Sequence, residues 1–406
     1  SKKGLSKISI PSLILSIAFI VFTFWGSILS PISKSLNVQQ GDINLPWQLA
    51  LDISSDTLKQ KPIFGAGPNK FGNEFLLNKP QELNQTMFWN TPFETGFNYL
   101  QSVLTTNGIL PTLAFIIVLI LVLVHAFRLF NYQFPDRFSR FIAVSSLLMT
   151  IAVILLFIFG APGLVLIVSG FIYIGLLFGV SSLVGKTEVI SLEYLKDPRI
   201  SFFAILSLAI ATMGSFSAVY FTGSRFASIV FYNKAIASTD IVSAERYINK
   251  AISLSSNDEY WRARTTLYTN EFTKLAQTEN PDKTRLQGLF TQAEQSAQSA
   301  ISRNRRSATN WLILSQVYQL ISTGEENNEA LKNAKTAGEE ALKRNPVNPA
   351  YFLNNAKIAF IGKDTSLAFE QIEKAISLKT DYLDAYIFRG QIKQNQGNTQ
   401  GLKEEL

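Results

Sequence analysis

The sequence predicts an all-α protein in two parts: a polytopic helical membrane domain, then an α-solenoid of paired helices. Two observations predict this. The first half contains long stretches without Asp, Glu, Lys or Arg, whereas residues 222–406 are polar and carry apolar residues at helical spacing. A bilayer core about 30 Å thick needs roughly 20 apolar residues as a helix. No long series of segments alternates with a period of two, which excludes a membrane β-barrel.

The uncharged stretches predict about five transmembrane helices. Residues 141–185 form a run too long for one span, and Gly160-Ala161-Pro162-Gly163 interrupts it. We therefore interpret this run as two spans joined by a tight turn. The predicted spans are 8–30, 105–127, 141–160, 163–184 and 200–221.

Basic residues predict the orientation, because short cytoplasmic loops are enriched in Lys and Arg. Lys2, Lys3 and Lys7 favour a cytoplasmic N-terminus, and the short loop of residues 128–140 carries three arginines. The loop of residues 185–199 is nearly balanced in charge and gives a weaker signal for the inside. This topology predicts a multi-pass plasma (inner) membrane protein of a prokaryote, with residues 222–406 extracytoplasmic. A cleaved secretory signal is excluded, since the first apolar run is too long and lacks a cleavage site.

Composition excludes several classes of function. The net charge of +7 is spread along the chain and does not favour nucleic-acid binding. The chain has no cysteine and one histidine, His125, so we expect no disulfide, no metal site and no cofactor. His125 is interpreted as a polar cap at a cytoplasmic helix end. Because the chain begins with Ser1 rather than Met, we expect a processed product or a fragment of a longer protein.

The loop of residues 31–104 is long for a connection between two spans, and long loops are often functional. Residues from Asn44 onward predict a helix, because Pro46 suits a first turn and Lys59-Gln60-Lys61-Pro62 stops the helix. The predicted apolar face of this helix consists of Trp47, Leu51 and Leu58.

Gly65 and Gly67 follow this helix, and glycine permits positive φ and close approach of the backbone to a ligand. A phosphate-binding P-loop is excluded, because Gly72 is followed by Asn-Glu rather than by Lys-Ser/Thr. A dinucleotide fingerprint is excluded as well, because Lys70 stands where a third glycine is required and no βαβ unit surrounds it. Two interpretations stay open for these glycines: a tight turn at the membrane surface, or direct contact with a substrate.

The order of these elements resembles the outer loop of the O-antigen ligase and polymerase family. The resemblance rests on Trp47 at the start of a helix, then Pro62-x-x-Gly65-x-Gly67, then Phe71. Phe97-Asn98-Tyr99-Leu100 stands where that family has His-Asn-x-Tyr-Leu, and Gly108 lies eleven residues after Phe97. The resemblance spans roughly residues 8–130.

This resemblance implies a metal-independent glycosyltransferase that moves a polyprenyl-diphosphate-linked glycan to an acceptor on the outer face. In the family, arginines hold the diphosphate and the loop histidine assists the acceptor hydroxyl. This chain departs from that pattern, because Phe97 cannot accept a proton and residues 31–104 contain no arginine. Thr106 and Pro111 also replace the Glu and Gly often found near the glycine that opens the next helix.

Glu94 is the candidate general base in place of the histidine. Its alternatives are a solvated loop charge or a partner for a lysine. The candidate substrate-binding residues are Gly65, Gly67, Lys70, Trp89 and Asn98. Lys70 would meet a phosphate or lipid headgroups, and Trp89 would stack on a sugar or anchor the loop at the interface. Loss of activity and a wrong alignment of the motif are the remaining alternatives.

Residues 222–406 contain a repeated pattern. A small residue and an aliphatic residue recur as a pair, and an aromatic residue follows each pair at a similar distance. The pairs begin at Ala251, Ala300, Ala341 and Ala375, and the aromatics are Trp261, Trp311, Tyr351 and Tyr386. The last interval is 34 residues, the tetratricopeptide (TPR) period, and loop insertions near residues 279–282 and 323–328 would lengthen the others. We expect four TPR-like units with a partial fifth, whose concave face binds a protein or peptide. A plain helical bundle is the alternative.

The sequence thus predicts a membrane domain, residues 1–221, with an extracytoplasmic loop of residues 31–104, followed by a repeat domain, residues 222–406. The expected function is a glycan ligase or polymerase whose repeats recruit a partner or acceptor. The alternative is a non-catalytic membrane scaffold that uses its repeats for assembly. The expected partners are the glycan carrier, membrane lipids and a protein, with no nucleic acid. A transporter is disfavoured, because the predicted spans contain no Asp, Glu, Lys or Arg.

Overall fold

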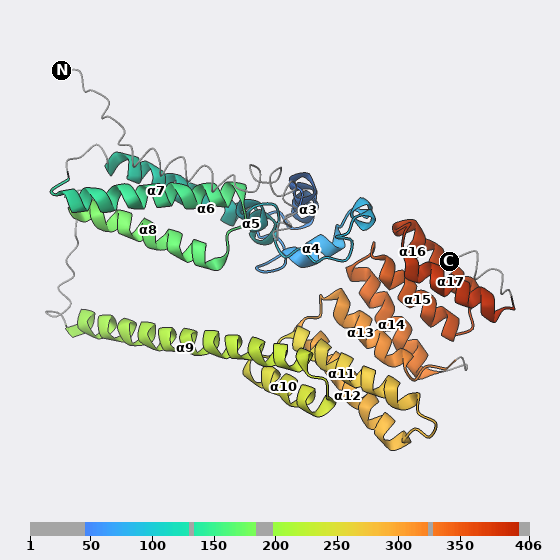
Figure 1. Ribbon diagram of the computed structural model, residues 1–406. Helices are drawn as coiled ribbons and strands as arrows, with labels where there is room; N and C mark the ends of the chain where they lie inside the picture. The colour runs from blue at the N-terminus through green and yellow to red at the C-terminus, as the bar shows by residue number, and fades with distance from the viewer. Residues whose placement is uncertain (1–44, 130–133, 184–197, 324–327, 398–406) are drawn as a thin grey trace, which may run out of the picture. The chain divides into compact units, whose positions relative to one another are not determined.

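A computed structural model describes residues 45–129, 134–183, 198–323 and 328–397 (Figure 1). Within these ranges every regular element is a helix, which confirms the all-α prediction. The first predicted span, residues 8–30, lies outside the described residues. Contacts divide the chain into two units, which are described separately. The first comprises Ser1–Asn78 with Pro92–Ser191, and the second comprises Lys79–Thr91 with Leu192–Leu406.

Three apolar helices of the first unit are long enough to cross a bilayer: α6 (Ile109–Leu129), α7 (Arg137–Phe159) and α8 (Leu164–Leu183). They lie within four residues of the predicted spans, and the turn predicted at residues 160–163 separates α7 from α8 (Figure 1). Their shared core is formed by Val122, Ala126, Leu129, Ala143, Leu177 and Val180. The His125 ring stacks on Phe178 of α8, with ring centroids 4.5 Å apart. Its interpretation as a polar helix cap was therefore wrong, because the ring packs sideways between two helices.

The loop of residues 31–104, called the outer loop after its predicted side of the membrane, contains α3 (Trp47–Gln60), α4 (Phe71–Leu77), the 3-10 helix η1 (Gln81–Gln85) and the start of α5 (Tyr99–Asn107). The helix predicted after Asn44 is confirmed as α3: Pro46 precedes its first residue and it ends just before Lys61. The predicted apolar face of α3 was wrong. Trp47 and Leu51 are 56% and 44% exposed, and the buried residues are Ala50, Ile53, Ser54 and Thr57.

Hydroxyl groups explain this error. The Ser54 hydroxyl donates to Ala50 O and the Thr57 hydroxyl to Ile53 O, each at 2.8 Å. A side-chain donor bonded to its own helix can be buried without an unsatisfied group, so small polar residues form the packed face. A hydrophobicity pattern alone selects the opposite face.

One long helix joins the last predicted span to the repeats. Helix α9 (Pro198–Ala237) has 40 residues and continues well beyond residue 221. Its final turns pack on α10 (Ile241–Leu254), where Ala235, Ile248, Ala251 and Tyr260 form a buried cluster. The polar groups at this junction are also paired, because the Ser228 and Tyr260 hydroxyl oxygens lie 3.0 Å apart. The first helix of the repeat array is therefore the end of an apolar helix. Our boundary at residue 222 stays a prediction about where the membrane ends.

The rest of the second unit is a series of helix pairs. The helices are α11 (Asp258–Ala276), α12 (Lys283–Arg303), α13 (Ala308–Gln319), α14 (Glu329–Arg344), α15 (Pro349–Ile361), α16 (Thr365–Leu378) and α17 (Leu383–Asn395). Within the described residues, α9–α10, α11–α12, α13–α14 and α15–α16 pack as pairs, and α17 follows alone. The first helices α11, α13 and α15 also contact one another in sequence. This is the α-solenoid arrangement predicted from the repeated pattern.

The recurring alanines explain the pairing. Ala251, Ala300, Ala341 and Ala375 are all buried, and each lies three residues before its helix ends. Their carbonyls accept the N–H of the residue that follows the helix. Residues 279–282 lie in the link between α11 and α12, but most of the additional length is helical: α11 and α12 have 19 and 21 residues, whereas α15 and α16 have 13 and 14. Lengthened helices rather than a loop alone therefore widen the first interval.

Candidate functional site

Gly65, Gly67 and Gly108 form the centre of the outer loop, and all three have positive φ, at 61°, 106° and 81°. Ala66 N donates to Thr105 O at 3.0 Å, and Gly67 N donates to Thr106 O at 2.7 Å. These carbonyls end α5 and have no intrahelical partner, so the glycine turn caps that helix. The geometry of this tight turn therefore explains why positions 65 and 67 are glycines. Their contact with a substrate stays a prediction.

Lys70 lies next to this turn and precedes α4. A Cβ placed on Gly67 would be 3.4 Å from Lys70 Cδ and 3.6 Å from Lys70 Nζ. The half-buried side chain therefore folds back over the turn and brings its ammonium close to Gly67. An ammonium in this position can attract a phosphate group.

Glu94 is exposed, and its carboxylate lies against the backbone of Gly72. A Cβ on Gly72 would lie 2.7 Å from Glu94 Oε2, so a larger residue at this position would displace the Glu94 carboxylate. The neighbouring Phe93 is buried edge-on against Phe75, with ring centroids 5.2 Å apart, and holds this part of the loop. Within the described residues Glu94 is in no ion pair, which fits the alternative of a solvated charge.

Glu74 is a carboxylate that sequence reasoning missed. Glu74 as a whole residue is only 5% exposed, and its Oε1 accepts a hydrogen bond from Lys61 Nζ at 3.0 Å. Thr57 Oγ1 lies 3.4 Å from its second oxygen. This partly buried pair joins Lys61, just after α3, to Glu74 in α4 across the glycine turn, so its role is structural. The signal in the sequence was an acid and a lysine flanking that turn.

Asn98 begins α5. Its Oδ1 accepts from Gln101 N and its Nδ2 donates to Ile158 O, both at 2.8 Å. Tyr99 N also donates to Gly160 O at 2.8 Å. Asn98 therefore fastens the outer loop to the end of α7, and a role in substrate binding stays a prediction. Phe97, in the histidine position, is half-buried and its N–H donates to Gln101 Oε1 at 3.0 Å.

Trp89 belongs to the other unit. It lies in Lys79–Thr91, named the docking segment here, which packs on the last repeats. The Trp89 ring is 5.4 Å from the Tyr382 ring, and Lys379 Nζ is 5.7 Å from its centroid. The structure therefore groups Gly65, Gly67, Lys70, Glu94 and Asn98 in one unit and Trp89 in the second.

Two glutamines of the docking segment bind the end of α16. Gln81 Nε2 donates to Ser377 O at 3.0 Å, and Gln85 Nε2 donates to Leu378 O at 3.1 Å. Gln85 Oε1 in turn accepts from the Thr380 hydroxyl at 3.1 Å. The last carbonyls of a helix have no intrahelical donor, and these amides supply one.

Asn84 and Lys79 are the buried polar residues of the same segment, at 0% and 4% exposure. Asn84 Nδ2 donates to Val347 O at 2.7 Å, and Lys79 Nζ donates to Asn84 Oδ1 at 2.6 Å. Lys79 also donates to Trp89 O. Burial, with a smaller contribution from the Lys379 charge, lowers the pKa of Lys79 to about 8.

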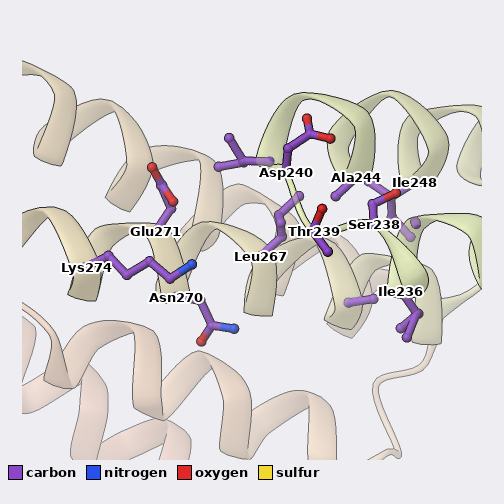
Figure 2. A pocket seen from close by; sticks show the side chains of 13 residues that line it. Ile236, Ser238, Thr239, Asp240, Ala244, Ile248, Leu267, Asn270, Glu271 and Lys274 are labelled. Carbon is purple, nitrogen blue, oxygen red and sulfur yellow. The ribbon is translucent and has the colours of Figure 1, made fainter.

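A cavity of about 330 Å³ lies between the end of α9, α10 and α11 (Figure 2). Its acidic residues already have structural partners. Asp240 Oδ1 accepts from Ser243 N at 2.8 Å and caps α10, while Glu271 pairs with Arg285 at 3.1 Å. Leu267 and Ile248 form part of its apolar wall. The cavity is a groove between repeats and carries no free pair of catalytic groups among its described lining residues.

No family model and no curated protein matches the chain. Among solved structures, two crystal structures of MamA are 19% and 18% identical, with TM-scores of 0.31 and 0.33. They cover 41% and 44% of this chain and 84% and 87% of their own. TTC0263, a thermophilic TPR protein of Thermus thermophilus, is 14% identical, with a TM-score of 0.35, and covers 46% of this chain and 87% of its own. The helix pairing of α9–α17, not these likenesses, carries the conclusions below.

Proposed function

We propose that this chain is a membrane-anchored scaffold that presents a protein-binding helical-repeat domain on the outer face. The observation that carries the proposal is the continuity of α9, whose apolar part is long enough to span a bilayer and whose last turns are the first helix of the array. A repeat domain that begins inside a membrane helix has its distance from the bilayer fixed by that helix.

The exposed face of the first helices is the candidate binding surface. Thr266, Gln316 and Gln391 are exposed and occupy the same position in α11, α13 and α17, five residues after the recurring aromatic. In α15 that position is the buried Ala356, and the neighbouring Lys357 is exposed instead. Neighbouring first helices contact one another, which places them on the inner side of a solenoid. Inner faces of solenoids are extended surfaces suited to polypeptides.

Photo-crosslinking tests this proposal. A benzophenone amino acid replaces Gln316 on the face of α13, and Glu370 on α16 serves as the matched exposed control. The expected result is a discrete crosslinked protein with the Gln316 probe in living cells, absent with the Glu370 probe. Crosslinks of equal yield at both positions, or at neither, would remove the scaffold proposal.

A second candidate function is glycan transfer at the outer loop. It is supported by the convergence of the residues that carry the family resemblance: the Gly65 turn bonds to the end of α5, Gly108 packs on that turn, and Asn98 opens α5. In this proposal Lys70 binds the diphosphate of the carrier and Glu94 accepts the proton of the acceptor hydroxyl. Gly65, Gly67 and Asn98 would contact the substrate, whereas Trp89, which packs on the last repeats, is not part of this proposed site.

Glycan profiling of cells tests the second candidate. Glu94→Gln is expected to reduce the transferred glycan at least about a hundredfold, the lower end of a general-base effect, and Lys70→Ala is expected to reduce it as well. Asp52→Asn and Lys59→Ala are matched controls, since both residues are exposed on α3. Unchanged glycan in both test variants would exclude catalysis by these residues and leave the scaffold proposal intact.

A further inference from the structure

The loops after α14 and α16 form an edge of the last two repeats, and the docking segment covers it. The loop after α14 contributes Val347 O, which accepts from Asn84, and Asn348, which donates to Asn90 Oδ1 at 3.3 Å. The end of α16 contributes the carbonyls bound by the two glutamines. This surface, residues 345–348 and 377–382, is named the loop edge here. It is distinct from the exposed face of the first helices.

Recognition at the loop edge uses main-chain atoms of the repeats. Ser377 O, Leu378 O and Val347 O accept from three side-chain amides of the docking segment. One repeat earlier, Arg305 O accepts from Trp311 Nε1 and from Arg344 Nε, each at 2.9 Å. The equivalent Thr380 O after α16 accepts from the Tyr386 hydroxyl at 3.0 Å. The donors to Val347 O, Ser377 O and Leu378 O instead come from a segment more than 250 residues away in sequence.

An aromatic contact completes the site. The Trp89 ring packs on Tyr382 beside the Lys379 ammonium, and Trp89 joins the buried core of the last repeats. Three amides on the 3-10 helix η1, followed by an indole, make a pattern that another polypeptide can present. Buried aromatics of this kind dominate the free energy of polypeptide binding.

The docked segment also contains an unfavourable feature. The Lys79 ammonium is buried against two neutral acceptors, Asn84 Oδ1 and Trp89 O. Lys379, paired with Asp381, adds a second positive charge nearby. Burying an ammonium without a carboxylate partner opposes docking. A polypeptide with the same amides and indole but no lysine would bind without the free-energy cost of burying an ammonium.

We propose that the loop edge is a binding site for a polypeptide that presents side-chain amides from a helical turn followed by an indole, with Lys79–Thr91 as its displaceable resident ligand. The amides bind the carbonyls that end α16 and the loop after α14, and the indole binds Tyr382. A partner with this chemistry replaces the docking segment and frees the outer loop at Thr91, three residues before Glu94. This site is additional to the proposed binding face on the first helices.

The test uses the full chain in lipid nanodiscs and a fluorescein-labelled peptide with the sequence of residues 79–91, followed by fluorescence anisotropy. In the intact chain the tethered segment competes at a millimolar effective concentration, so little peptide binds. The chain variant Asn84→Ala/Trp89→Ala weakens the resident ligand and leaves the loop edge unaltered. We expect the peptide to bind this variant at least about tenfold more tightly than the intact chain.

Two controls make the result specific. A peptide with the same two substitutions is expected not to bind, and the chain variant Met87→Ala, at a side chain 81% exposed, is expected to behave as the intact chain. Gln85→Ala is a second releasing variant in case the double variant misfolds, which circular dichroism reports. Equal binding of the peptide to intact and releasing variants, or binding to none of them, would overturn the proposal. Because no partner protein is used, this outcome is independent of the crosslinking test on α13.

Discussion

Gly65 and Gly108 pack backbone against backbone, and a Cβ on Gly108 would lie 2.5 Å from Gly65 N. A Cβ on Gly65 would likewise lie 2.6 Å from Gly108 N. Both residues have positive φ, so the contact depends on glycine at both positions. This contact joins the turn after α3 to the junction of α5 and α6, and it holds the outer loop on the membrane helices of its unit.

Gly108→Ala is therefore expected to destabilise the first unit by at least about 2 kcal/mol, because it adds both steric overlap and backbone strain. The measurement is the melting temperature of the purified chain in detergent. Gly179→Ala in α8 is the control, since nothing lies within 4 Å of its added Cβ. Equal melting temperatures for the two variants would show that the glycine contact is not required.

Docking of Lys79–Thr91 is expected to depend on pH. The pKa of Lys79 is about 8 when docked, below its ordinary value of 10.5, so the released state holds the proton more strongly. Docking is weakest below pH 8 and strengthens as the pH rises from 8 towards 10.5. The titratable groups near Lys79 are Lys379, its partner Asp381, and Tyr382. Burial raises the pKa of Tyr382 to about 12.

Spin labels on Met87→Cys and Leu383→Cys report this docking, because both side chains are exposed and the chain has no native cysteine. The equilibrium constant for docking is the ratio of docked to released segment. We expect it to be more than about tenfold larger at about pH 10 than at about pH 7.5. Lys79→Met is expected to remove the dependence. A docked fraction that is constant with pH in the unsubstituted background would contradict the assignment to Lys79.

The recurring alanines permit a direct test of the repeat packing. Ala375→Leu adds three carbon atoms at a fully buried position between α15 and α16 and is expected to cost about 1–3 kcal/mol. Ala276→Leu, at the exposed end of α11, is the matched control. Urea unfolding followed by circular dichroism measures both, and a similar midpoint for the two variants would argue against close packing at Ala375.

Phe97→His tests whether the family resemblance extends to chemistry. An imidazole has a pKa near neutrality and can accept the proton that a phenyl ring cannot. The Phe97 backbone is fixed by its bond to Gln101, so the new side chain starts from the same position. If the outer loop transfers glycan, the variant is expected to raise product above the unsubstituted level in cells. Product at or below that level counts against a histidine-like role for this position.

Composition and periodicity predicted the helices well, because their physical causes are local. Uncharged runs of sufficient length gave α6, α7 and α8, and buried alanines repeated near the helix ends gave the pairs of the solenoid. The face of α3 was predicted wrongly, because Ser54 and Thr57 satisfy their hydroxyls within the helix and can be buried. Hydrophobicity does not contain that information.

The docking segment could not be predicted, because its partners are far away in sequence. Gln81 and Gln85 bond to Ser377 and Leu378, and a glutamine in a loop gives no local sign of such a partner. The continuity of α9 was accessible in principle: residues 222–226 contain no proline to stop a helix. Of the candidate site residues, Asn98 shows its role most clearly, as an Asn in a helix-capping position.

Labelling of single cysteines in intact cells tests the central claim, the display of the repeat array and the glycine turn on the outer face. We expect a membrane-impermeant maleimide to label Ile63→Cys and Leu383→Cys in intact cells, and to label Pro135→Cys, before α7, only after permeabilisation. All three side chains are exposed. Labelling of Pro135→Cys in intact cells, with Ile63→Cys and Leu383→Cys protected, would contradict the account.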